Sequence, residues 1–152
     1  MKVLTYRGFI FSCFILLSLS YSSFARTDTD MQSLNLLIEQ AQNKKAQLVI
    51  FKRCAAVYLT SSSTAKVRPD TAEFEKKLKG VAKFFIFLST ELGKSDEVNQ
   101  DSNQIEQDID NLYSYYLADI EKNKNPDGSF ADGLMQDDLP ICSSIYEASK
   151  TL

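Results

Sequence analysis

Histidine is the residue type whose absence says most about this sequence, because none of the 152 residues is a histidine. Ser–His–Asp and Cys–His nucleophilic catalysis both need an imidazole base, and most zinc enzymes use histidine ligands. Carboxylate pairs remain as acid–base candidates, namely Glu106 with Asp110 and the adjacent Asp137 and Asp138. We interpret both pairs as solvated surface charge. The sequence therefore predicts no enzyme activity, with a carboxylate-based hydrolase as the remaining enzymatic alternative.

Glycine and proline are also scarce, with five and three residues, and there is little strand-type alternation of apolar and polar residues. Apolar residues instead recur every three or four positions, which is the spacing of a helix with one buried face. This pattern predicts an all-α fold, a small helical bundle of three long helices and a short C-terminal helix. The long helices are expected over about 30–59, over 70–92 and from either 96 or 101 to 122, and Pro140 is expected at the first position of the short helix.

Several breaks in the pattern carry expectations about the connections. Residues 43–45 interrupt the first apolar stripe and mark either a break in the helix or a solvated turn of it. The polar stretch TSSSTAKVRP, residues 60–69, predicts a loop, and an irregular segment is expected up to Leu139. Gly93 is placed to end the second long helix as the residue just beyond it. Gly80 lies inside that helix, where we expect it to allow a neighbouring helix to approach closely.

Long apolar runs are missing after the N-terminus, where one run extends from Phe9 to Tyr21. Lys2 and Arg7 precede this run, and small residues follow it at Ser23-Phe24-Ala25. This is the layout of a secretory signal peptide, and the run is too short and too rich in serine to be a good membrane span. We therefore expect a signal peptide over 1–25, a single helical domain over 26–152 and export to the periplasm or the medium. A retained N-terminal anchor is the alternative.

Basic charge is not in excess. Without residues 1–25, which contain Lys2 and Arg7, 15 basic and 20 acidic residues remain, and the net charge is −5. Nucleic acid and anionic membranes both attract a basic surface. The charge thus argues against nucleic acid and an anionic membrane surface as partners. The lack of a second long apolar run argues against stable membrane insertion once the signal is removed.

Cysteine is limited to three residues, and Cys13 lies within the predicted signal peptide. The even number that remains, Cys54 and Cys142, predicts a disulfide in an exported protein. Closing a loop of this length stabilises the folded state by about 4–5 kcal/mol in the chain-entropy model. A redox-active or metal-binding thiol pair is the alternative, but the chain has no C-x-x-C motif.

The segment NKNPDGSF resembles the first half of a calcium-binding loop. Asn123, Asn125 and Asp127 would occupy ligand positions 1, 3 and 5. However, position 12 is Leu134, so the bidentate glutamate of such loops is missing. We interpret the segment as a turn and predict neither a metal nor a cofactor.

Aromatic residues leave two functional interpretations open. Phe87 lies off the apolar stripe of its predicted helix and Tyr115 lies off the stripe of the next, so both are candidate contacts for a partner protein. The favoured interpretation is an exported, non-enzymatic interaction protein, which includes the case of a secreted effector. The alternative is a carrier that holds a small apolar ligand among the aromatic side chains of the bundle.

The segment FKRCAAVYL, with one cysteine on an early helix and a second on a late one, resembles an "RCAALY"-type segment. That segment occurs in a group of small, exported, all-helical proteins of alphaproteobacteria. Residue identities match only over 53–59. Over most of the mature chain the resemblance is limited to the order of its features, which are the signal peptide, the helices and the two cysteines. It implies bacterial export and a helical bundle, and it implies no functional residue because the group has no assigned activity.

Overall fold

The computed structural model describes residues 31, 33–65, 72–125 and 133–151. Within these ranges the chain forms five helices and no strand, which confirms the all-α prediction. The helices are α1 (Leu34–Glu39), α2 (Lys44–Ala65), α3 (Ala72–Gly93), α4 (Ser102–Lys122) and α5 (Leu134–Ser149). The signal peptide predicted over 1–25 lies outside the described residues.

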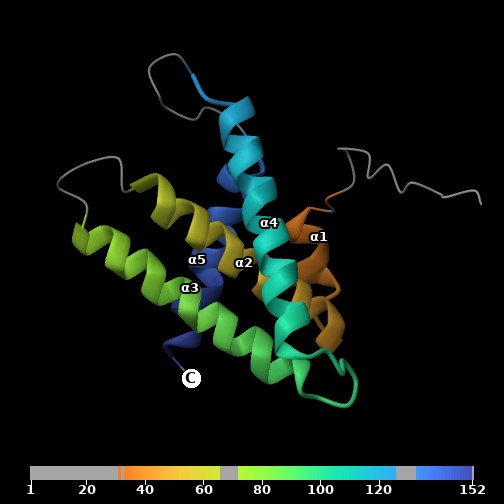
Figure 1. The fold of residues 1–152 in the computed structure, drawn as a ribbon. Helices are drawn as coiled ribbons and strands as arrows, with labels where there is room; N and C mark the ends of the chain where they lie inside the picture. The colour runs from red at the N-terminus through yellow and green to blue at the C-terminus, as the bar shows by residue number, and fades with distance from the viewer. Residues whose placement is uncertain (1–30, 32, 66–71, 126–132, 152) are drawn as a thin grey trace, which may run out of the picture. The chain divides into compact units, whose positions relative to one another are not determined.

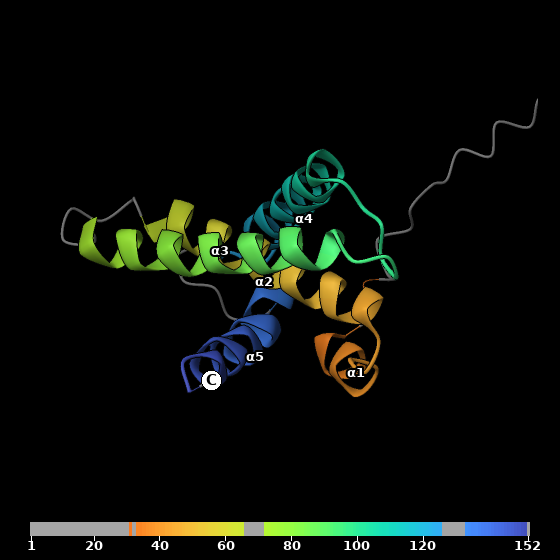
Figure 2. The same cartoon turned by 90° about the horizontal axis from the view of Figure 1, so that it is seen from below.

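Helix α2 is the centre of the bundle, and the other four helices pack around it (Figures 1 and 2). Its residues are buried on all sides, without interruption from Lys52 to Tyr58. Small side chains at Ala55 and Ala56, both fully buried, allow neighbouring helices to approach the backbone of α2 closely. A helix that is enclosed in this way can position side chains toward several neighbours at once.

Helices α3 and α4 are amphipathic and bury only the faces that the apolar spacing predicts. Phe85 of α3 and Ile105, Ile109 and Tyr116 of α4 are all at most 2% exposed. Asp101 is the N-cap of α4, and its carboxylate accepts a hydrogen bond of 2.9 Å from the backbone N–H of Gln104. This cap decides the start of the third long helix, which the sequence alone left between residues 96 and 101.

The first predicted helix is in fact two helices, α1 and α2. The amide oxygen of Asn43 accepts a hydrogen bond of 2.7 Å from the N–H of Ala46, which satisfies a donor in the first turn of α2. The interruption in the apolar stripe is therefore a break, because the asparagine stabilises a new helix start.

The loop predicted over residues 60–69 was wrong for its first half, since α2 continues to Ala65. The hydroxyl groups in this stretch donate to carbonyl oxygens one turn back, for example Thr60 to Ala56 and Ser61 to Val57, both at 2.8 Å. Serine and threonine are weak helix formers in water. Here most of them are covered by packing, and their hydroxyls find partners within the helix, so tertiary burial overrides local propensity.

The expected irregular segment before Pro140 was also wrong. Helix α5 starts at Leu134, so Pro140 lies inside the helix and not at its first position. A proline there removes one backbone hydrogen bond. Asp138 and Cys142, on either side of it, are both buried and held by other helices, which explains why the helix persists through the proline.

Gly93 and Gly80 differ from their predicted roles. Gly93 is the last residue of α3, not the residue beyond it, and a Cβ atom there would lie 2.5 Å from Cδ1 of Ile105 and 2.7 Å from the carbonyl oxygen of Gln100. A close approach thus requires glycine at this position. At Gly80, by contrast, a Cβ atom would meet nothing within 4 Å, and no neighbouring helix makes use of it.

Candidate functional site

Three consecutive residues of α2 each tie the central helix to another part of the bundle. Lys52 forms an ion pair with Asp108 of α4, Arg53 binds residues of α4 and α5, and Cys54 forms a disulfide with α5. All three are buried although two of them carry a charge. Successive residues point in directions about 100° apart around a helix axis, which is how adjacent residues reach different neighbours.

The disulfide predicted between Cys54 and Cys142 is present. Both cysteines are 0% exposed, and their Cα atoms are 5.3 Å apart. It closes a loop with a sequence separation of 88 residues between α2 and α5. Because the sulfur atoms are shielded from solvent, the bond has the character of a structural cross-link and not of an accessible redox centre.

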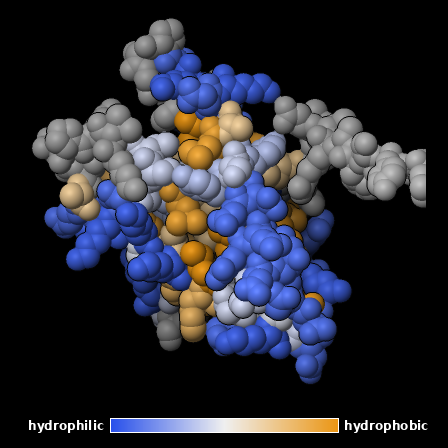
Figure 3. Space-filling view, in the orientation of Figure 1, coloured by the Kyte–Doolittle hydropathy of each residue, from blue (hydrophilic) through white to orange (hydrophobic). Residues whose placement is uncertain are grey.

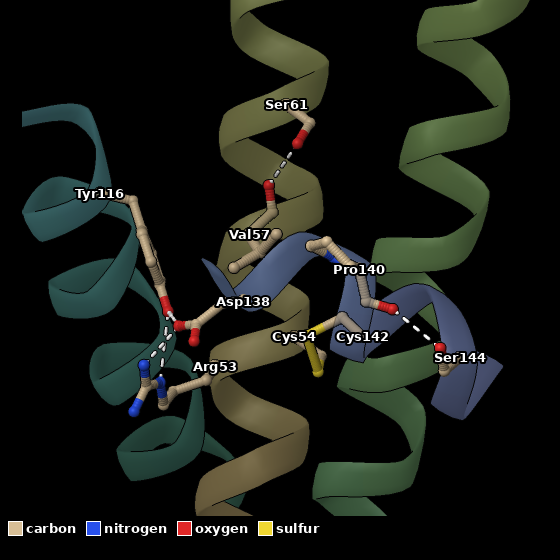
Figure 4. Close-up of a disulfide and its surroundings, with 9 residues drawn as sticks. All are labelled: Arg53, Cys54, Val57, Ser61, Tyr116, Asp138, Pro140, Cys142 and Ser144. Atoms are coloured by element: carbon tan, nitrogen blue, oxygen red, sulfur yellow. Dashed lines mark hydrogen bonds and ion pairs between the residues drawn. A yellow bond between two sulfur atoms is a disulfide. The ribbon is translucent and has the colours of Figure 1, made fainter. Parts of the chain in front are cut away.

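Beside the disulfide, Arg53, Tyr116 and Asp138 form a closed polar cluster (Figure 4). The Nε–H of Arg53 donates to the hydroxyl oxygen of Tyr116 at 3.2 Å. The Nη2 group of Arg53 and the hydroxyl of Tyr116 both donate to Oδ2 of Asp138. Each of the three side chains therefore contacts the other two, and the cluster joins α2, α4 and α5.

Burial and mutual contacts shift the pKa values of Tyr116 and Arg53. Burial raises the pKa of Tyr116 well above its ordinary value of 10.0, and the charge of Asp138 raises it further. Burial by itself lowers the pKa of Arg53, but the electrostatic interactions and hydrogen bonds with Tyr116 and Asp138 more than offset this, so the net shift is upward. Tyr116 thus stays neutral and Arg53 stays charged throughout the physiological pH range.

The cluster is shielded from solvent, and its polar groups bond one another. Arg53 and Asp138 have side chains that are only 2% exposed. Among the described residues, no buried side-chain nitrogen or oxygen lacks a hydrogen-bond partner. The donors and acceptors of the cluster are directed at one another, so a substrate would have to displace them before it could be bound.

Asp138 corrects an expectation from the sequence, which placed both Asp137 and Asp138 on the surface. Asp137 is exposed, whereas Asp138 is 2% exposed. A signal for this was available, because Asp138 and Cys142 are four residues apart and thus share a helix face. The irregular structure expected before Pro140 hid that spacing. Glu106 and Asp110 are exposed, as expected for surface charge.

A second polar network lies between α2 and α4. The carboxylate of Asp108 accepts hydrogen bonds from Lys52 at 2.6 Å, Gln100 at 2.8 Å and Gln104 at 3.0 Å. Partial burial raises the pKa of Asp108, but these three donors outweigh it and the net shift is downward. This network stabilises the contact of α2 with the start of α4.

The predicted partner contacts lie on different helices and differ in accessibility. Phe87 on α3 is 60% exposed, the largest exposed fraction among the large apolar side chains that the structure describes. Tyr115 on α4 is partly buried, and its ring packs edge-on against that of Tyr116 with the centroids 6.4 Å apart. Phe87 is thus an exposed surface residue, whereas Tyr115 belongs in part to the packing around the buried cluster.

The calcium-loop resemblance falls partly outside the described residues, because Asp127 is among those not described. The side-chain amide of Asn123 donates to Asp119 at 3.0 Å, and Asn123 ends α4 as its C-cap. In the described part of the chain, no three cysteine or acidic residues gather as metal ligands would.

Comparison with known proteins gives no family for this chain. The sequence matches no protein-family model, and neither a curated protein nor a solved structure is significantly similar to it. None of the helices over the described ranges combines the length and the apolarity that are needed to span a bilayer.

Proposed function

We propose that this chain is an exported, non-enzymatic protein that binds another protein through the outer face of α3, with Phe87 at the centre of the contact. The observation that carries the proposal is the 60% exposure of the Phe87 side chain. Burying an exposed phenylalanine in an interface removes a large apolar area from water, and aromatic residues are enriched at the centres of protein interfaces.

The use of the polar residues supports a binding role over catalysis. Arg53, Asp138 and Tyr116 hold helices together, and Lys52 and Asp108 do the same in a second place. Active sites are built from titratable side chains with perturbed electrostatics. The buried titratable side chains of this structure already bond one another and hold helices together.

The packing of the aromatic side chains favours an interaction protein over a carrier. Phe85 contacts the rings of Phe51, Tyr58, Phe84 and Tyr146, with centroid distances from 5.4 to 6.4 Å. These are the distances of directly packed rings. A ligand carried in the bundle would have to separate them.

Export is part of the proposal and rests on the N-terminal sequence together with the disulfide, since disulfides persist in oxidising compartments. The intact mass of the protein recovered from a cell that expresses the full chain tests it. We expect the mass of residues 26–152 with no thiol that reacts before reduction. A product that retains residues 1–25, or that has two free thiols, would contradict export.

Photo-crosslinking tests the binding face. Phe87→p-benzoylphenylalanine should give a covalent adduct with a partner protein on illumination of the mature chain in its native compartment. Phe74→p-benzoylphenylalanine is the matched control, because Phe74 is on the same helix and is 55% exposed. Equal labelling from both positions, or no adduct from position 87, would show that the outer face of α3 is not the binding surface.

A further inference from the structure

The outer face of α3 carries a basic stripe with Phe87 within it. At 100° per residue, Lys76, Lys83, Phe87 and Lys94 lie within about 20° of a common direction, opposite the buried face. All four residues are exposed. Lys94 is one residue beyond the helix, but its N–H still bonds the carbonyl oxygen of Thr90. Within the described residues, neither Lys76 nor Lys83 has an ion-pair partner, whereas Lys94 pairs with the exposed Glu91 of its own chain at 2.5 Å and would exchange that partner on binding.

Helix α4 carries the opposite charge on a stripe of its own. The helix contains five acidic residues and one basic residue. Asp110, Leu117 and Glu121 again lie within about 20° of one direction. Asp110 and Glu121 are exposed, and Leu117 is partly exposed. Leu112 and Tyr113 of the same helix pack against the buried core, whereas Leu117 is not among the residues that do so.

The two stripes match in spacing as well as in charge. Lys83 and Lys94 are eleven residues apart, and so are Asp110 and Glu121, a rise of about 16 Å along either helix axis. If an α3 helix lies antiparallel to an α4 helix of another molecule, a single register places Lys83 opposite Glu121 and Lys94 opposite Asp110. The same register places Phe87 opposite Leu117. One alignment therefore forms two ion pairs with an apolar contact between them.

We propose that the partner of the α3 face is a second copy of this chain, bound with the basic stripe of one copy antiparallel to the acidic stripe of the other. The proposal rests on the proposed binding role of Phe87 and names its partner. Each copy carries both stripes, so a twofold arrangement uses the contact twice. Figure 3 shows a band of apolar surface between hydrophilic side chains on the face of the molecule that this view presents.

Sedimentation velocity of the oxidised mature protein between about 5 and 500 µM tests the self-association. We expect the mean mass to rise with concentration at about 20 mM salt and to rise less at about 0.5 M, because exposed ion pairs are screened. A single monomer boundary at every concentration in low salt would overturn the proposal.

Charge reversal identifies the surfaces. Lys83→Glu and Glu121→Lys should each weaken self-association about tenfold or more, since each places like charges opposite one another. An equimolar mixture of the two variants should restore association, because the carboxylate introduced at position 83 of one copy then faces the ammonium group introduced at position 121 of the other. Lys45→Glu, at an exposed position on α2, is the control with the same charge change and should have no effect. Association that survives both reversals, or that the mixture fails to restore, would refute this pairing.

Phe87→Ser separates this inference from the proposed function. If the chain associates and Phe87→Ser weakens association while Phe74→Ser does not, both stand. If the chain stays monomeric but position 87 still crosslinks to a different protein, the second copy is ruled out and the binding role remains. If association occurs and Phe87→Ser leaves it unchanged, the second copy does not bind the α3 face and this inference fails, while crosslinking from position 87 still decides the proposed function.

Discussion

The replacement Asp138→Asn probes the buried cluster most directly. Asparagine has nearly the same shape as aspartate, so the change removes the negative charge and leaves the packing in place. The guanidinium group of Arg53, on a side chain that is 2% exposed, then loses the carboxylate that accepts a hydrogen bond from its Nη2 group. Breaking a buried ion pair on one side costs about 3–5 kcal/mol. That is a large part of the roughly 5–15 kcal/mol that stabilises a typical domain.

Urea unfolding of the oxidised protein, followed by circular dichroism at 222 nm, measures this loss. We expect the midpoint to fall strongly for Asp138→Asn with an unchanged slope, because the unfolded state exposes the same surface. Asp137→Asn is the neighbouring control at an exposed position and should change the free energy of unfolding by less than about 0.5 kcal/mol.

A double variant distinguishes a charge effect from a packing effect. Arg53→Met combined with Asp138→Leu removes both charges at once, and such replacements of buried pairs are often neutral or stabilising. The double variant should therefore be more stable than Asp138→Asn alone. A loss below about 1 kcal/mol for Asp138→Asn, or equal losses for the variants at 137 and 138, would refute the assignment of a buried, charged cluster.

The packing and the pKa shifts support three further predictions, all measured by the same unfolding assay. Gly80→Ala should stabilise the protein by about 1 kcal/mol, because alanine is the better helix former and the added methyl group meets nothing. Gly93→Ala should instead destabilise it by about 1–3 kcal/mol, because its methyl group would overlap with neighbouring atoms. Similar changes in stability at both sites would contradict the packing described. The folded-state pKa of Asp108 lies below its ordinary value of 3.8, so the stabilising effect of that carboxylate is present above that value and is lost as the pH falls through the folded pKa. Asp108→Asn should accordingly be less stable than the parent at pH 6, and the difference should shrink in acid. Cys54→Ala combined with Cys142→Ala should cost about 4–5 kcal/mol, and a variant as stable as the oxidised parent would show that the cross-link does not stabilise the fold.

Much of the fold could be predicted from the sequence because its signals are local. The spacing of apolar residues along α3 and α4 is a property of each segment alone, and it identifies the face that any neighbour must cover. The disulfide was predictable for a different reason, since two cysteines outside the predicted signal peptide allow only one pairing. The interruption at Asn43 was visible too, although the choice between a break and a continuous helix depended on the cap that the asparagine forms.

The candidate site could be predicted only in part. Cys54 and Cys142 were found, and the exposed Phe87 was named as a contact. Arg53 and Tyr116 were not singled out, because an arginine and a tyrosine that are 63 positions apart give no local sign that they meet. The stripes on α3 and α4 could be read from helical periodicity, but their pairing in one register needed the helix boundaries and the exposure of each residue.

By itself the sequence determined the helical class, the buried faces of the long helices and the one cross-link that its cysteines permit. Only the tertiary structure decided that one of two adjacent aspartates is buried and the other exposed, that a run of serine and threonine continues a helix, and that a proline lies inside α5. The local preferences of serine, threonine and proline cost about 1–3 kcal/mol, and burying a carboxylate costs several kcal/mol unless it is paired. Burial, an ion pair and a disulfide contributed by distant parts of the chain together outweigh these costs.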